Sequence, residues 1–256
     1  MPLASFVFAS LAASSLAVAA PHAERTTWTS GGITFEGTLV WDEATTTKRP
    51  GLLMVPNWYG ATDLAVEKAK GIAGTRYVVL VADVYGKGVR PKTADEAGTA
   101  AGGLYADRPL LRTRARAALD AFATARAPLD PTQIAAIGFC FGGSTVLELA
   151  RSGAPLDAVV SFHGGLATPS PAGPGALRAP ILVLNGAADG YVPAADLAAF
   201  QQEMVTAGAD WQLVQLGGAV HCFTETDANS PGCLYDARTA TRAYAMMEGL
   251  LGEVFR

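Results

Sequence analysis

A single cysteine sits in a glycine-rich turn that would present it as a nucleophile. Cys140 is central in Gly138-Phe139-Cys140-Phe141-Gly142-Gly143, between an apolar run that favours a strand and a run that favours a helix. Glycines two residues before and after the cysteine remove side chains that would collide where the chain doubles back. The helix start supplies unpaired N–H groups and a positive dipole end, which favour a thiolate and a developing oxyanion. The alternative is a buried cysteine in a Gly-rich turn, and this motif alone does not decide between them.

A thiol nucleophile needs a histidine base and a carboxylate that orients it, so the three histidines of the chain narrow the search. His22 lies near the N-terminus, whereas His163 and His221 each follow an apolar run that favours a strand. In α/β-hydrolases the nucleophile precedes the acid and the histidine comes last, which selects Asp189 and His221 as partners of Cys140. For His163 we expect a structural role or a hydrogen bond behind the site. The alternatives are a surface-loop histidine at position 221 and a helix N-cap at position 189.

Two backbone N–H groups are candidates for the oxyanion hole that acyl transfer requires. One is the N–H of Phe141, directly after the nucleophile. The other is the N–H of Trp58, in the loop Pro56-Asn57-Trp58-Tyr59-Gly60. Packing of Trp58 and Tyr59 over the core is a second interpretation of this loop, and it is compatible with the first.

The rest of the chain alternates apolar runs with helix-favouring segments. Strands are predicted at residues 33–40, 52–55, 77–81, 134–137, 158–162, 181–184 and 211–216, and helices at 61–73, 109–126, from about 142, 193–207 and 237–250. The first strand is expected to be antiparallel, and strands separated by helices imply an α/β fold whose mostly parallel sheet carries helices on both faces. In such folds, sites form at the carboxyl ends of the strands. Residues 86–106 are the least regular and are expected to form a small flap over the site.

The N-terminal segment differs from the rest of the chain. Residues 3–20 carry no charged side chain and contain Ala17-Val18-Ala19, which is similar to a signal-peptidase site. We therefore predict a signal peptide at residues 1–20, cleaved near Ala19-Ala20, and a single domain at 21–256 in a secreted or periplasmic protein. An uncleaved anchor helix and a disordered leader are the alternatives, although the apolar run is short for a spanning helix. No later segment is long and apolar enough to cross a bilayer, so no membrane association is expected after cleavage.

The composition narrows the class of protein. Of the 256 residues 50% are hydrophobic and 16% are charged, which excludes a disordered chain. The formal net charge is −4 and the chain has no basic run, so the sequence offers no positively charged surface for nucleic-acid binding. Export would place the three cysteines in an oxidising compartment. Cys222 and Cys233 are then a candidate disulfide that leaves Cys140 unpaired, and the alternative is two more free thiols.

Together these residues resemble the dienelactone hydrolase family of α/β-hydrolases. The similarity rests on the Cys140 turn, Ala82-Asp83-Val84-Tyr85-Gly86, Asp189-Gly190-Tyr191-Val192-Pro193 and Val220-His221-Cys222-Phe223, and it extends over roughly residues 33–252. It implies that Cys140 attacks an ester or lactone carbonyl, that His221 relays protons and that Asp189 orients His221. It implies a small-molecule ester or lactone as the partner and neither a metal nor an organic cofactor. The oligomeric state is not indicated, and a monomer is favoured.

Three positions depart from the pattern of the family and bear on the substrate. By the resemblance, Asn57 stands where a glutamate helps to control the protonation of the thiol, so activation would fall on His221 and the helix dipole. Lys87 and Glu225 match two arginines that bind the carboxylate of the substrate, and a glutamate there would repel an anion. We therefore expect a neutral or cationic ester rather than dienelactone. The candidate pocket residues are Asn57, Tyr59, Tyr85, Lys87, His163 and Glu225.

Other functions fit the same residues. Acyl transfer to another nucleophile, or thioester hydrolysis, would keep Cys140, Asp189 and His221 and change the reaction that follows. A non-catalytic small-molecule binder is favoured by the departures at Asn57 and Glu225 and disfavoured by the intact nucleophile, acid, histidine and turn glycines. A thiol-redox protein would use Cys140, but the chain has no C-x-x-C motif and no evident resolving cysteine.

Overall fold

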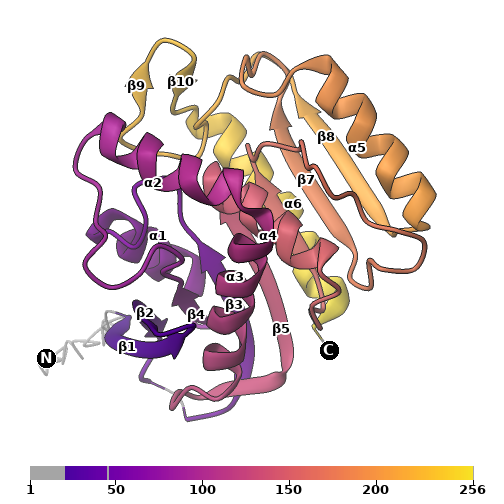
Figure 1. Cartoon of the computed structure of the whole chain (residues 1–256). Helices are drawn as coiled ribbons and strands as arrows, with labels where there is room; N and C mark the ends of the chain where they lie inside the picture. The colour runs from indigo at the N-terminus through magenta and orange to yellow at the C-terminus, as the bar shows by residue number, and fades with distance from the viewer. Residues whose placement is uncertain (1–20, 45, 256) are drawn as a thin grey trace, which may run out of the picture.

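The computed structural model describes residues 21–44 and 46–255, so the predicted signal peptide lies outside the described residues. Its centre is an eight-stranded sheet in the order β1-β2-β4-β3-β5-β6-β7-β8 (Figure 1). The strands are β1 (His22–Ser30), β2 (Ile33–Trp41), β3 (Arg49–Val55), β4 (Val78–Val81), β5 (Leu129–Phe139), β6 (Val159–Phe162), β7 (Ile181–Gly186) and β8 (Trp211–Leu216). β2 is antiparallel to both of its neighbours, and β4, β3, β5, β6, β7 and β8 pair in parallel. The predicted mostly parallel α/β fold is confirmed.

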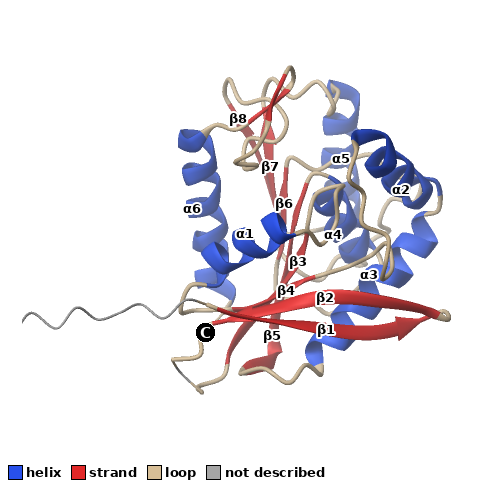
Figure 2. Cartoon of the chain, turned by 90° about the vertical axis from the view of Figure 1, so that its left-hand side faces the viewer, coloured by secondary structure: helices blue, strands red, loops and turns tan. Residues whose placement is uncertain are grey.

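Helices cover both faces of this sheet. They are α1 (Asp63–Ala73), α2 (Ala94–Ala106), α3 (Arg108–Ala123), α4 (Phe141–Arg151), α5 (Ala194–Ala207) and α6 (Ala237–Val254). α1 and α6 contribute to the core on one face, and α2, α3, α4 and α5 to the core on the other (Figure 2). A short hairpin of β9 (Asn229–Ser230) and β10 (Cys233–Leu234) extends from the segment between β8 and α6. Within the part of the chain that the structure describes, no helix has the length and apolar character needed to cross a bilayer.

The sequence explains where these elements form and end. β4 is the run Val78-Val79-Leu80-Val81, and all four side chains are buried, as expected for a strand covered on both faces. Polar caps begin the helices that flank the site. Thr62 accepts a hydrogen bond from the N–H of Ala65 ahead of α1, and Asp236 accepts one from the N–H of Thr239 ahead of α6.

The irregular flap predicted for residues 86–106 is wrong in part, because α2 occupies its second half. Thr93 caps this helix by accepting from the N–H of Glu96. The buried face of α2 consists of Ala97, Ala101 and Leu104, an apolar stripe too weak to stand out among the neighbouring glycines. The prediction also omitted β1 and the β9–β10 hairpin. Most side chains of β1 are exposed or half-buried, so its sequence lacks the apolar alternation that marks a strand.

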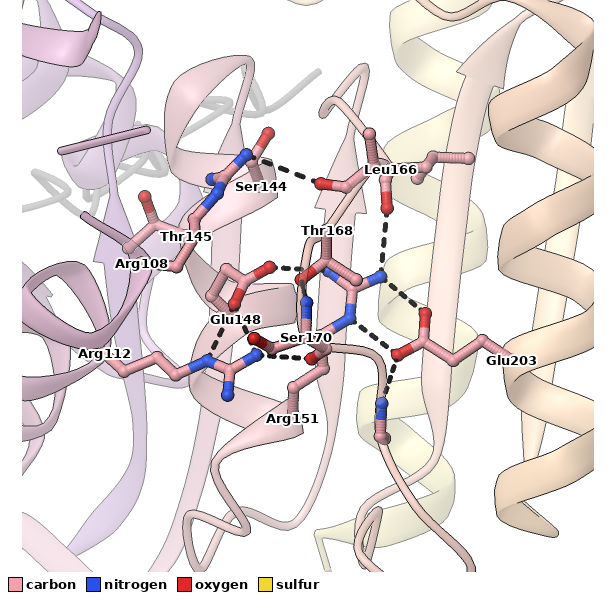
Figure 3. A network of polar contacts seen from close by, with 12 residues as sticks. Arg108, Arg112, Ser144, Thr145, Glu148, Arg151, Leu166, Thr168, Ser170 and Glu203 are labelled. Atoms are coloured by element: carbon pink, nitrogen blue, oxygen red, sulfur yellow. Dashed lines mark hydrogen bonds and ion pairs between the residues drawn. The ribbon is translucent and has the colours of Figure 1, made fainter. Parts of the chain in front are cut away.

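A buried ionic network anchors α4 on the face opposite α1 and α6 (Figure 3). Arg151 donates through Nη1 to Glu148 at 3.0 Å, and Arg112 of α3 donates through Nε to the same carboxylate at 2.7 Å. Arg151 also pairs with Glu203 of α5, through Nε at 2.8 Å and Nη2 at 2.7 Å. A further bond to the carbonyl of Leu166 reaches the segment after β6. The network thereby fixes the helix that starts directly after Cys140.

Candidate active site

The turn between β5 and α4 has the strained geometry that its glycines allow. Cys140 adopts φ 54° and ψ −115°, which non-glycine residues rarely hold. A Cβ at Gly138 would collide with the carbonyl of Gly142, and one at Gly142 would collide with the carbonyl of Val55. The N–H of Cys140 donates to the carbonyl of Phe162, which ties the turn to β6. The thiol is therefore held, half-buried and unpaired, at the carboxyl end of the parallel strands.

His221 contacts both Cys140 and Asp189 at this edge of the sheet. The Nδ1–H of His221 donates to Oδ2 of Asp189 at 2.7 Å, and Nε2 of His221 lies 3.1 Å from Sγ of Cys140. The three side chains come from segments that follow β8, β7 and β5. The structure thus brings together the three residues selected from the order of the sequence. A nucleophile within hydrogen-bonding reach of a base that a carboxylate orients is the geometry that nucleophilic catalysis requires.

The charge of His221 is set by competing effects. Burial disfavours its charged form, but the hydrogen bonds to Asp189 and Cys140 outweigh burial and raise the pKa of His221 to about 10. An imidazolium donates from both ring nitrogens, which matches the carboxylate of Asp189 on one side and the sulfur of Cys140 on the other. Asp189 is held in turn, because its Oδ1 accepts the N–H of Tyr191 at 2.9 Å. The arrangement can hold a proton donor beside the nucleophile.

Two side chains fix the loop that carries Trp58. Oδ1 of Asn57 accepts the N–H of Tyr59 at 3.0 Å, and the hydroxyl of Tyr85 donates to the carbonyl of Trp58 at 2.9 Å. Phe141 is the first residue of α4, where N–H groups have no partner within the helix. The N–H groups of Trp58 and Phe141 remain the candidate oxyanion donors.

Aromatic side chains surround the thiol. The ring of Phe141 lies 5.3 Å from that of Tyr85 and 5.4 Å from that of Tyr105, between ring centroids. Burial and then the neighbouring Cys140 raise the pKa of Tyr105 to about 12, so this phenol stays neutral near the thiol. On another side, the exposed ring of Tyr191 lies 5.0 Å from the ring of His221. These rings favour apolar or aryl groups in a substrate.

His163 lies behind His221 and is fully buried. Their rings meet edge to face with centroids 5.1 Å apart, and Nε2 of His163 donates to the hydroxyl of Thr224 at 2.7 Å. Burial, followed by the nearby charges of His221 and Lys68, lowers the pKa of His163 well below 6.5. A neutral His163 therefore supports the segment after His221 from behind, while its φ of 39° adds strain at the end of β6.

Glu225 has a different environment from the one expected. Its carboxylate accepts Nδ2–H of Asn57 at 2.7 Å and forms an ion pair with the ammonium of Lys68 on α1. The predicted repulsion of an anionic substrate by Glu225 is therefore wrong, because Lys68 already compensates the charge of this carboxylate. Asn57, Tyr59 and Glu225 all line a cavity beside α1 whose lining includes neither Cys140 nor His221.

Lys87 is also engaged elsewhere. Its ammonium lies 3.2 Å from Oε2 of Glu36 on β2, and its side chain is 53% exposed. The loose match of Lys87 to an arginine that binds a substrate carboxylate therefore finds no support in its contacts. Tyr85 is the candidate pocket residue whose pKa responds to the thiol: burial raises it first, then Tyr105, and then Cys140.

Cys222 and Cys233 form a disulfide, and Cys140 is the free cysteine. The bond joins the residue after His221 to the β9–β10 hairpin. The N–H of Leu234 also donates to the carbonyl of His221 at 3.1 Å. Together these contacts hold the backbone of His221 against the hairpin.

Four residues that contact this region were not found from the sequence: Lys68, Tyr105, Ser144 and Thr224. Ser144 and Thr224 lie within four residues of the two motifs, so proximity in sequence was an available signal. Tyr105, whose hydroxyl donates to Ser144 at 3.2 Å, falls in the segment expected to be irregular. Lys68 is one charge among several on α1, and no sequence pattern pairs it with Glu225.

Comparisons with known proteins support the same fold. The Dienelactone hydrolase family model matches residues 35–255. The structure called m3DLH and that of P91, a dienelactone hydrolase-like promiscuous phosphotriesterase from metagenomic libraries, each have a TM-score of 0.86 and 38% identity, over 93% of this chain and 100% of theirs. The uncharacterised Caenorhabditis elegans protein K02A2.1 is 34% identical over 151 residues, which are 57% of this chain and 94% of that protein.

Proposed function

This chain belongs to the dienelactone hydrolase family, and we propose that it hydrolyses a carboxylic ester or lactone through Cys140, His221 and Asp189. The observation that carries the proposal is the position of His221, with Nε2 3.1 Å from Sγ of Cys140 and Nδ1 2.7 Å from Asp189. The strained turn at Cys140 supports it, because such backbone strain concentrates where a side chain must be presented to a substrate.

In the first half of the reaction, the sulfur of Cys140 attacks the carbonyl carbon and forms a C–S bond. The carbonyl electron pair moves to oxygen, and the N–H groups of Phe141 and Trp58 stabilise this oxyanion. The intermediate then collapses, the C–O bond to the alcohol breaks, and His221 gives its proton to the departing oxygen. The products of this step are the free alcohol and a thioester on Cys140; a lactone leaves its alcohol attached to the acyl group.

In the second half, His221 is neutral and takes a proton from a water molecule. The hydroxide oxygen attacks the thioester carbon, and the same two N–H groups receive the second oxyanion. Collapse breaks the C–S bond, which releases the carboxylic acid and restores the thiolate beside a protonated His221. Asp189 keeps the ring of His221 oriented and stabilises its charge in both halves.

The side chains around the thiol favour a neutral substrate with an apolar or aryl group. Tyr85, Tyr105 and Phe141 form an aromatic wall on one side. Neither Lys87 nor Glu225 presents an uncompensated charge to a substrate, since Glu36 and Lys68 are their respective partners. A carboxylate on the substrate would thus find no dedicated arginine at these positions.

A phosphotriester is the second candidate substrate class. The relative P91 is described as a promiscuous phosphotriesterase and is 38% identical over 93% of this chain. A phosphoryl oxygen would use the same N–H donors as a carbonyl oxygen, and attack by Cys140 would leave a thiophosphate ester on the enzyme. Turnover would then depend on how fast water releases that ester.

Export remains a proposal. The uncharged residues 3–20 and the Ala17-Val18-Ala19 sequence favour a signal peptide. The disulfide between Cys222 and Cys233 is consistent with an oxidising compartment. N-terminal sequencing of the protein from its native cell fraction tests this, and a chain that retains residues 1–20 in the cytoplasm would refute it.

The test of the reaction is turnover of a panel of neutral aryl esters, lactones and aryl phosphotriesters by the purified protein. In protein that remains folded, Cys140→Ala and His221→Ala should each lose activity on the order of 10³-fold or more. A trapped thioester on Cys140, seen by intact mass after acid quench, would identify the intermediate. Activity that survives both substitutions refutes the mechanism, and an inert wild-type protein would favour a non-catalytic binder.

A further inference from the structure

A cavity of about 620 Å³ lies beside α1 and α6. These two helices cover the face of the sheet opposite α2 to α5 (Figure 2). Its lining includes Met54 of β3 and Phe139 of β5, together with residues of both helices and of the segment after His221. The lining contains neither Cys140 nor Asp189 nor His221. Its volume falls in the range of small-molecule sites, so this space has the size of a second binding site.

The charges of the lining favour a cation. Among the described residues that line the cavity, four carry a carboxylate and one carries an ammonium. The carboxylates are those of Glu67, Glu225, Asp227 and Glu248, and the ammonium is that of Lys68. Lys70 and Arg76, which are not part of the lining, pair with Glu67 and Glu248, while Lys68 pairs with Glu225. Asp227 is exposed, and no ion pair to it is found among residues 21–44 and 46–255. Once these pairs are counted, Asp227 leaves a surplus of one negative charge, which favours a cationic over an anionic ligand.

Aromatic rings add a second feature that binds cations. Tyr59, Phe139, Tyr235 and Tyr244 are part of the lining. The ammonium of Lys68 already covers the buried ring of Phe139, 4.0 Å from its centroid, so the half-buried or exposed rings of the three tyrosines are the ones left for a ligand. Aromatic faces combined with carboxylates are the usual environment for organic ammonium groups. The apolar side chains of Leu64, Ile72 and Met247 offer contacts for the rest of such a molecule.

We propose that this cavity is a ligand site, distinct from the Cys140 site, for a small organic ammonium with an apolar body. The ammonium lies against Asp227 and the tyrosine rings, and the apolar body extends between α1 and α6. This inference does not rest on the proposed hydrolase reaction, since none of its residues takes part in that chemistry.

The test is calorimetric binding of benzyltrimethylammonium to protein whose Cys140 has been alkylated with iodoacetamide, which blocks the thiol site. The matched variants are Gly71→Leu and Gly252→Leu. Both glycines lie in helices, and an added Cβ at either meets no atom within 4 Å, but only Gly71 lines the cavity. Leucine also favours a helix over glycine, so neither change should impair folding.

We expect the alkylated protein to bind the probe, Gly71→Leu to weaken binding about tenfold or more, and Gly252→Leu to leave it unchanged. Asp227→Asn should weaken binding about fivefold, and benzoate, an anion of similar size, should not bind. Absence of binding, equal affinity in Gly71→Leu and Gly252→Leu, or binding of benzoate as strong as that of the cation would each overturn the proposal.

Discussion

Two regions of the molecule bury charged or reactive side chains at short distances, and their backbones differ. In the ionic network, Glu148 and Arg151 lie one turn apart in α4 and Glu203 lies in α5, all in regular helix. The candidate active site instead holds the non-glycine residues that have positive φ in the described chain: Cys140 at 54°, His163 at 39° and Cys222 at 64°. Strain of this kind persists only where the surroundings impose it. The comparison indicates that buried charge alone does not mark the reactive site of this molecule, whereas strained backbone beside buried polar side chains does.

The two regions also differ in how their polar atoms are used. The carboxylate of Glu203 accepts two bonds from Arg151 and a third from the N–H of Ala172. Sγ of Cys140 contacts Nε2 of His221, and Cys140 is only half-buried. The network therefore contributes to the position of α4, and the active site uses that position.

The largest expected effect is on catalysis, through Asp189. An Asn at this position keeps the shape of the side chain but removes the charge that stabilises the imidazolium of His221. Asp189→Asn should lower kcat for an aryl ester on the order of 10³-fold in protein that remains folded. Asp196→Asn, on the first turn of α5, is the matched control and should keep wild-type kcat. Equal kcat in the two variants would mean that Asp189 does not act on His221.

The next effect is on stability, through Arg151. Arg151→Met leaves Glu203 buried without its two charged donors, which should cost about 3–5 kcal/mol of unfolding free energy in urea. In protein that remains folded, kcat should stay within about twofold of wild type, because the network only positions α4. The control is Arg116→Met, which breaks an exposed pair with Asp120 and should cost about 0.5 kcal/mol or less. A large loss of kcat without a loss of stability would assign the network to the reaction.

The same contrast explains what the sequence could predict. Cys140 was identified from its glycine-rich turn, and Asp189 and His221 from their order after it. Each lies in a segment that follows an apolar run, where the carboxyl ends of parallel strands meet. The turn glycines were informative because sterics leave no alternative at Gly138 and Gly142. These features depend on local sequence and on a rule of topology, so they are available without coordinates.

Long-range pairing of side chains was not predictable. Glu225 was expected to face a substrate, but Lys68, 157 residues away, neutralises it. The ionic network joins Arg151 to Glu203 across 52 residues and leaves no periodic signal. α2 was missed because its buried face is built from alanines and one leucine, which resemble the rest of an Ala- and Gly-rich segment.

The third expected effect tests how the strained His221 segment is held. Removing the disulfide with Cys222→Ser/Cys233→Ser should cost about 2–3 kcal/mol, since the cross-link restricts the unfolded chain over a short loop. Because the β9–β10 hairpin also bonds the carbonyl of His221, kcat should fall by less than about tenfold. Reduction of the wild-type protein with dithiothreitol should reproduce both changes. An unaltered urea midpoint would show that the disulfide does not stabilise this segment.

The smallest and most gradual effect is that of alkaline pH on the active site. The pKa of His221 is raised from 6.5 to about 10, so the imidazolium that protonates the leaving group persists through neutral pH. kcat/KM should therefore decline above about pH 10, approaching tenfold per pH unit. Asp189→Asn removes a cause of the raised pKa, so its residual activity should decline at lower pH than that of the wild type. A wild-type profile that declines near pH 6.5 would contradict the assignment.

Stability must be measured in parallel, because both buried histidines link folding to pH. His221 has a folded pKa above its unfolded value, so its contribution is complete below pH 6.5 and is lost as the pH rises through about 10. The pKa of His163 is lowered well below 6.5, so its contribution is present above that pH and is lost as the pH falls. Urea midpoints should therefore decline on both sides of neutrality. His221→Gln should remove the alkaline decline and keep the acidic one, which separates loss of the imidazolium from loss of the fold.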